Sequence, residues 1–105
     1  MGLIDANGKN FEELVQGEYA VADIYGDHCG ACVALAPIFE AAANEMPFIR
    51  FVHINISRNP ELGDRYGIHA IPTVYFYRNG EIVHSVVGSM SREELNAHIA
   101  KMLYQ

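Results

Sequence analysis

The chain has few cysteines and little positive charge, and each shortage excludes a class of protein. Only two cysteines occur among the 105 residues, far from the cysteine-dense framework that holds small secreted domains together. The seven Lys and Arg residues are outnumbered by 13 Asp and Glu residues, and the net charge of -6 would repel a phosphate backbone. We therefore expect neither a secreted disulfide scaffold nor a nucleic-acid partner.

Long apolar runs are missing as well. No stretch of the sequence approaches the roughly 20 residues that a membrane-spanning helix needs. The first ten residues lack the basic and apolar regions of a signal peptide. Half of the residues are apolar and 19% are charged, which is typical of soluble globular proteins. The sequence predicts a single domain over residues 1–105, located in the cytoplasm and without a membrane partner.

The order of the expected elements indicates an α/β fold. Runs of branched and aromatic residues predict strands over residues 19–25, 49–56, 73–77 and 81–87. Apolar spacing and capping residues predict helices over residues 10–16, from the cysteines to 46, over 59–66 and over 91–103. Asn10 and Asn59 are the expected caps of the first and third helices, Gly67 would end the third, and Ser91 with Glu94 forms a capping box before the last. Strand, helix and strand in succession favour a parallel pair with a crossover helix, and Asn79-Gly80 favours a tight antiparallel hairpin.

The two cysteines, Cys29 and Cys32, lie where the first strand gives way to a helix. Residues three apart on a helix share one face with Cβ atoms about 5 to 6 Å apart, and a disulfide tolerates Cα separations of about 4.4 to 6.8 Å. The pair can therefore hold two thiols or one bridge. Because the loop that a bridge would close is very short, structural stabilisation is a poor reason for it.

Position on the helix distinguishes the two thiols. The positive N-terminal end of a helix lowers the pKa of a thiol, which makes Cys29 the expected nucleophile. Cys32 lies one turn further on and would resolve a mixed disulfide. The alternatives are two buried apolar cysteines, or half of a zinc site completed by a histidine such as His28. Since a structural zinc site usually needs four ligands and the sequence has no second cysteine pair, we expect no metal.

Several separated motifs occur in the order and spacing of one known family. They are Asp23, Cys29-Gly30-Ala31-Cys32, Pro37, Asn59-Pro60, residues 66–73, Asn79-Gly80 and Val87-Gly88. The chain thereby resembles the thioredoxins over nearly its whole length. The resemblance implies a thioredoxin fold, in which a central mixed β-sheet is flanked by helices on both faces, and a cis peptide bond between Ile71 and Pro72. A cis bond is essentially confined to proline, and Pro72 stands where a strand begins.

The resemblance also implies an activity. It predicts a protein-disulfide reductase that serves electron transport and cell redox homeostasis, with no cofactor besides the redox-active Cys29 and Cys32 pair. Its partners would be disulfide-containing proteins and an electron donor similar to thioredoxin reductase, and the chain would be a monomer. By similarity, the backbone of Ile71, beside Pro72, would pair with an extended substrate segment. Gly88 would keep the neighbouring surface flat, although a turn would explain this glycine equally well.

The active-site sequence departs from the usual family pattern. Thioredoxins typically carry Trp, Pro and Lys where this chain has His28, Ala31 and Val33. We expect His28, Gly30 and Ala31 to lie on the substrate-binding surface. His28 either stabilises the Cys29 thiolate or is an exposed bystander. The departures leave two other functions open, a more oxidising oxidase or isomerase and a binding or metal-carrier module without turnover.

An acid and a histidine complete the expected site. Asp23 matches the buried acid that, in this family, assists proton transfer at the second cysteine, and burial should raise its pKa. The family usually places a lysine beside that acid, and the matching residue here is His53. His53 would then support the proton transfer. A hydrogen-bonded structural Asp and a core histidine are the alternatives.

Overall fold

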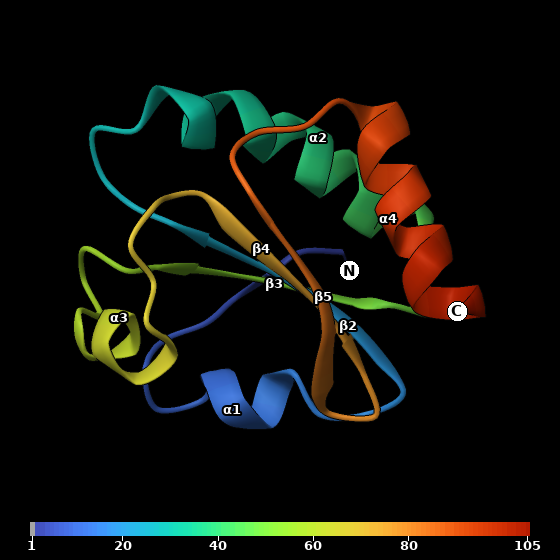
Figure 1. Ribbon diagram of the computed structural model, residues 1–105, viewed down its shortest axis with the longest axis horizontal. Helices are drawn as coiled ribbons and strands as arrows, with labels where there is room; N and C mark the ends of the chain where they lie inside the picture. The colour runs from blue at the N-terminus through green and yellow to red at the C-terminus, as the bar shows by residue number, and fades with distance from the viewer. Residues whose placement is uncertain (1) are drawn as a thin grey trace.

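The computed structural model describes residues 2–105. In chain order its elements are β1 (Ile4–Asp5), α1 (Phe11–Leu14), β2 (Tyr19–Tyr25), α2 (Gly30–Glu45), β3 (Arg50–Asn55), α3 (Glu61–Tyr66), β4 (Thr73–Arg78), β5 (Glu81–Val87) and α4 (Arg92–Tyr104). The five strands form one sheet in the order β1-β3-β2-β4-β5. Strand β2 is parallel to β3 and antiparallel to β4, so the expected mixed sheet is confirmed (Figure 1).

Helices cover both faces of the sheet, as predicted (Figure 1). On one face α2 and α4 pack against the sheet through a core that includes Phe39 and Leu95. On the other face α1 and α3 contribute Phe11 and Leu62. Because successive side chains of a strand point to opposite faces, Asp23 shares the α2 side of β2 with Val21 of that first core.

Local signals located most of the elements. The bounds of β2 and β5 are those predicted, and β3 and β4 differ only at their ends. In the hairpin between β4 and β5, Asn79 and Gly80 have φ values of 53° and 81°, which a tight turn of this type requires. The capping box predicted before α4 is complete, because Ser91 and Glu94 exchange both of its hydrogen bonds. Each of these signals depends on residues only a few positions apart.

Helix α1 begins after Asn10 as predicted and α3 begins one residue later than predicted, but neither asparagine caps its helix with its side chain. Asn10 makes no side-chain cap for α1, and its Oδ1 instead accepts from the Asn7 N–H at 2.8 Å. Asn59 does not cap α3, since its side chain donates to the Asn55 carbonyl and accepts from the Gly8 N–H. Helix α1 also ends earlier than predicted, and the two-residue strand β1 was not predicted at all.

Helix α2 carries the functional motif at its first turn and stays helical across Pro37. Helix α3 ends at Gly67, whose φ of 64° gives the left-handed cap that the sequence suggests. Within residues 2–105, no helix has both the length and the apolar character needed to cross a membrane.

Candidate functional site

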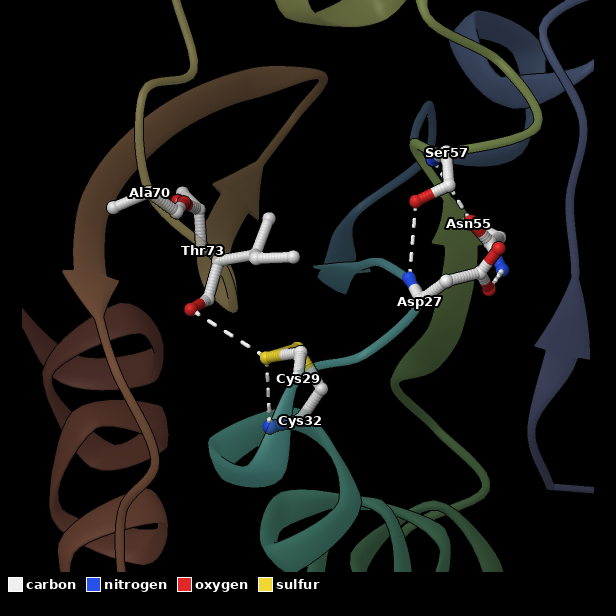
Figure 2. Close-up of a disulfide and its surroundings, with 8 residues drawn as sticks. Asp27, Cys29, Cys32, Asn55, Ser57, Ala70 and Thr73 are labelled. Atoms are coloured by element: carbon white, nitrogen blue, oxygen red, sulfur yellow. Dashed lines mark hydrogen bonds between the residues drawn. A yellow bond between two sulfur atoms is a disulfide. The ribbon is translucent and has the colours of Figure 1, made fainter.

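Cys29 and Cys32 are joined by a disulfide at the N-terminus of α2. Their Cα atoms are 5.2 Å apart, inside the range that a disulfide tolerates. Cys29 is the N-cap residue, with an extended backbone, and its Sγ accepts the Cys32 N–H at 3.1 Å (Figure 2). The first turn of α2 therefore points an amide at the outer sulfur. An amide in this place stabilises negative charge, as a thiolate would carry.

The two sulfurs differ in their access to solvent. Cys29 is half-buried, whereas Cys32 is only 5% exposed. A partner molecule can reach the outer residue, while the inner one is sheltered by the helix and the sheet. This asymmetry supports the roles expected from the sequence, with Cys29 attacking and Cys32 resolving.

A second loop faces the disulfide. The peptide bond between Ile71 and Pro72 is cis, as predicted. The Ile71 carbonyl oxygen lies 3.7 Å from Cys29 Sγ, where it can accept from the thiol of the reduced form. Next to it, the Gly88 N–H donates to the Pro72 carbonyl at 2.8 Å. Gly88 has a φ of 100°. This backbone conformation favours glycine whether or not a substrate lies against it.

Asp23 lines an open hollow that it shares with the disulfide. The side chain is 3% exposed, and its Oδ1 has no hydrogen-bond partner among residues 2–105. Burial raises the pKa of Asp23 to about 7, because the carboxylate is poorly solvated there. The hollow has a volume of about 430 Å³, and its lining includes Asp23, Cys29, Cys32 and His53. A group that exchanges protons near neutral pH therefore shares a cavity with both sulfurs.

His53 lies opposite Asp23 in the register between β2 and β3, and it lines the same hollow. Its ring nitrogen Nε2 is nevertheless paired with Asp5 Oδ1, at 3.4 Å. The ring also packs on Tyr25, with 5.3 Å between the centroids. The structure thus brings His53 to the site but directs its side chain toward a carboxylate of β1, a residue that the sequence analysis did not consider.

The predicted substrate-binding residues of the loop and first helical turn lie on the surface. His28, Gly30 and Ala31 are exposed, and His28 has a φ of 55°, which is unusual for a residue with a side chain. Val33 is 73% exposed and lines the hollow beside the disulfide. This surface therefore carries an apolar side chain where thioredoxins typically have a lysine.

Sequence reasoning missed a hydrogen-bonded network behind the disulfide. The Asp27 N–H donates to Ser57 Oγ at 3.0 Å, and Asn55 Nδ2 donates to Asp27 Oδ1 at 3.0 Å. The Ser57 N–H in turn donates to Asn55 Oδ1 at 2.8 Å, which closes the network (Figure 2). It ties the loop before Cys29 to the end of β3. No local pattern could reveal it, because the two bonds to Asp27 join residues 30 and 28 positions apart in the sequence.

Within the described part of the chain, no group of three or more His, Cys, Asp or Glu side chains could hold a metal ion. The disulfide itself is the chemical group that this surface presents to a partner. A half-exposed sulfur over a buried one, with a buried acid behind them, is suited to disulfide exchange.

Comparisons with known proteins agree with this geometry. The sequence model named Thioredoxin matches residues 2–101. The thioredoxin of Alicyclobacillus acidocaldarius is 32% identical, with 98% of this chain and 97% of the relative covered. The thioredoxin of Bacillus subtilis is 30% identical over 98% of this chain and all of the relative. The crystal structure of Chlamydomonas reinhardtii thioredoxin f2 has a TM-score of 0.86 and 31% identity, with 95% of each chain covered. The chain belongs to the thioredoxin family and is a thiol-disulfide oxidoreductase.

Proposed function

We propose that this oxidoreductase works as a reductant of disulfides in partner proteins, with Cys29 as the nucleophile. The observation that carries the proposal is the unequal exposure of the two sulfurs at the start of α2. An attacking thiolate must meet its target, whereas a resolving thiol must be protected from solvent oxidants and stay within reach of the first sulfur.

The reaction starts from the dithiol form. The Cys29 thiolate attacks one sulfur of the substrate disulfide, which forms a mixed disulfide and releases the other substrate sulfur as a thiolate. Cys32 then loses its proton and attacks Cys29 Sγ, which releases the second substrate thiolate and forms the bridge between Cys29 and Cys32. Two electrons pass from the protein to the substrate. We propose that Asp23 accepts the Cys32 proton through the hollow that both residues line.

The substrate would lie along the loop that contains the cis bond. The Ile71 carbonyl is placed beside Cys29 Sγ, and an extended peptide can pair with backbone groups at such a position. Gly88 next to Pro72 projects no side chain over this surface. Contacts with His28, Gly30 and Ala31 would complete the substrate-binding surface, with His53 supporting proton transfer behind it.

We further propose the cellular setting of the reaction. A dithiol reductase needs a reducing compartment, which favours the cytoplasm. The disulfide formed in each turnover has to be reduced again, and we assign this step to a flavoprotein that resembles thioredoxin reductase. The chain would act as a single-domain monomer without a cofactor, in the electron transport that maintains cell redox homeostasis.

The direction of electron flow can be tested by measuring the reduction potential of the cysteine pair at equilibrium. The Cys29 and Cys32 pair is equilibrated against dithiothreitol and glutathione buffers, and the oxidised fraction is measured by alkylation and mass spectrometry. A reductase should show a potential clearly more negative than the about −180 mV of protein disulfide isomerase. A potential at or above that value would assign the protein to the oxidases or isomerases instead.

Replacing His28 with Ala tests its effect on the nucleophile. If the imidazole stabilises the Cys29 thiolate, the pH midpoint of Cys29 alkylation in the reduced protein should rise, because the thiolate loses a nearby positive charge. His69 is also exposed, and His69→Ala provides the matched control. An unchanged midpoint in His28→Ala would make His28 a bystander.

Replacing Asn55 with Ala tests the network behind the disulfide. Its amide bonds both Asp27 Oδ1 and the Ser57 N–H, so its removal frees the loop that presents Cys29. Since small displacements of reacting groups are costly, disulfide exchange should slow by roughly tenfold, and the potential of the pair should shift. Asn44→Ala, an exposed change on α2, serves as control. If the Asn55→Ala protein folds and has the wild-type exchange rate and reduction potential, the network has no influence on disulfide exchange.

A further inference from the structure

A pair of histidines outside the redox site links the edge strand of the sheet to the last helix. His84 of β5 and His98 of α4 approach until His84 Nε2 is 2.7 Å from His98 Nδ1. Their rings are stacked, with centroids 4.6 Å apart and an angle of 29° between the planes. Both rings also lie on Phe76, at centroid distances of 5.5 and 5.7 Å. The two nitrogens are thus held together by packing from three elements.

The surroundings of His98 favour its neutral, metal-binding form. Each ring is half-buried. Burial, with smaller contributions from the neighbouring His84 and Lys101, lowers the pKa of His98, while Glu94 acts weakly in the opposite direction. A neutral imidazole has one nitrogen with a free lone pair, which is the form that binds metal ions.

We propose that His84 and His98 form a bidentate site for a divalent transition-metal ion such as Zn²⁺, bound through His84 Nε2 and His98 Nδ1. Zinc lies about 2.0 to 2.1 Å from a histidine nitrogen, so two ligands must be about 2.9 Å apart at a right angle and about 3.3 Å apart at the tetrahedral angle. The observed 2.7 Å is close to both. To bind the ion, the nitrogens have to separate by a few tenths of an ångström, and both rings have to turn so that their lone pairs point at the ion and not at each other.

Ion binding needs no oxidant and no net loss of a proton from the neutral pair. One of the two facing nitrogens carries the hydrogen of the bond between the rings. When the ion takes its place, that hydrogen moves to the outer nitrogen of the same ring, which changes the tautomer. A surface hollow of about 360 Å³, which His84 lines, gives solvent access, and water completes the coordination shell.

The neighbouring charges do not assist binding of a cation. Arg78 and Lys101 line the same hollow and repel any divalent ion, so the affinity has to come from bonds to the imidazole nitrogens. Glu94 is one turn before His98 on α4, but its carboxylate accepts the Ser91 N–H in the capping box. Mg²⁺ and Ca²⁺ prefer oxygen ligands, whereas imidazole suits zinc, nickel and copper. The site should therefore discriminate between these two groups of ions.

Calorimetric titration of the disulfide form with Zn²⁺ tests the proposal, because the bridged Cys29 and Cys32 cannot ligate the ion. Wild-type protein should bind one equivalent of Zn²⁺, and its unfolding midpoint should rise with the Zn²⁺ concentration. Mg²⁺ at the same concentrations should do neither. Both His84→Gln and His98→Gln should weaken binding by at least tenfold, while disulfide-reductase activity shows that each variant is folded.

His69→Gln and His53→Gln are the matched controls, since each removes one imidazole from another surface. They should bind Zn²⁺ as the wild type does. The proposal is overturned if the wild-type protein binds no Zn²⁺, or if binding persists in both the His84 and the His98 variants. Equal loss of binding in His53→Gln would place the ion beside the redox site and would also overturn it.

Discussion

A Cys32→Ser variant should stop halfway through the reaction and remain covalently attached to its substrate. Cys29 is half-buried at the N-terminus of α2 and keeps the amide that supports its thiolate. It can therefore still attack a disulfide. Without the buried sulfur of Cys32, no second attack releases the product. A mixed disulfide should accumulate in stoichiometric amounts, detected as a mass adduct that dithiothreitol removes.

The reverse variant separates the two roles. Cys29→Ser should form no adduct and should reduce protein disulfides only at the rate of the uncatalysed exchange, because the remaining thiol is 5% exposed. Both replacements change one sulfur to oxygen at neighbouring positions, which makes them a matched pair. Adducts on Cys29→Ser but not on Cys32→Ser would invert the assignment. Catalytic turnover by either single variant would exclude the two-thiol reaction altogether.

Replacing Asp23 with Asn should alter both stability and rate. The pKa of Asp23 is raised by burial from 3.8 to about 7, so between these values the folded protein keeps a proton that the unfolded chain has lost. The free energy of unfolding of the wild type therefore falls as the pH rises from about 4 to 7 and stays low above 7. The total fall due to this group is on the order of 4 kcal/mol.

The amide that replaces the Asp23 carboxyl cannot ionise, so the variant should lack this part of the pH dependence. The comparison is made by urea unfolding of the disulfide form at pH 4.5 and pH 8. Relative to the wild type, Asp23→Asn should gain stability on going to the higher pH, whatever its absolute stability. Asp5→Asn is the control, because it removes an exposed carboxylate from His53. Parallel pH profiles for wild type and Asp23→Asn would contradict a raised pKa of Asp23 in the folded protein.

The kinetic consequence concerns the resolving step. If Asp23 accepts the Cys32 proton, its loss should slow the release of product from the mixed disulfide by on the order of 10²-fold, while formation of the mixed disulfide keeps its rate. Rapid-mixing experiments with a fluorescent disulfide substrate separate the two steps. An unchanged rate of release would leave Asp23 as a structural residue only.

Much of the fold could be predicted because its signals are local. A capping box needs two residues three positions apart, and Ser91 with Glu94 forms it as expected. A tight hairpin needs two successive residues with positive φ values, and Asn79 and Gly80 both have them. The strand bounds follow from side-chain alternation. The pairing of β1 with β3 had no such signal, because two residues are too few to show a period.

The redox motif was predictable for the same reason. Two cysteines three residues apart at the start of a helix can form a disulfide, and the helix N-terminus stabilises the thiolate of the first. Contacts between distant segments had no local signal, and only the family resemblance pointed to Asp23 and to the loop of Ile71 and Pro72. The register of the sheet put His53 beside Asp23, but side-chain packing turned it toward Asp5. Packing likewise made the network of Asp27 with the end of β3.

The sequence by itself determined the order of the elements and the identity of the two reacting sulfurs. Only the tertiary structure decided which polar groups lie against them and that His84 meets His98 across β5 and α4. The physical reason is the distance along the sequence over which each kind of interaction acts. Capping, turn geometry and side-chain period act over a few residues of chain. Burial and long-range pairing depend on the whole sheet closing around its two cores.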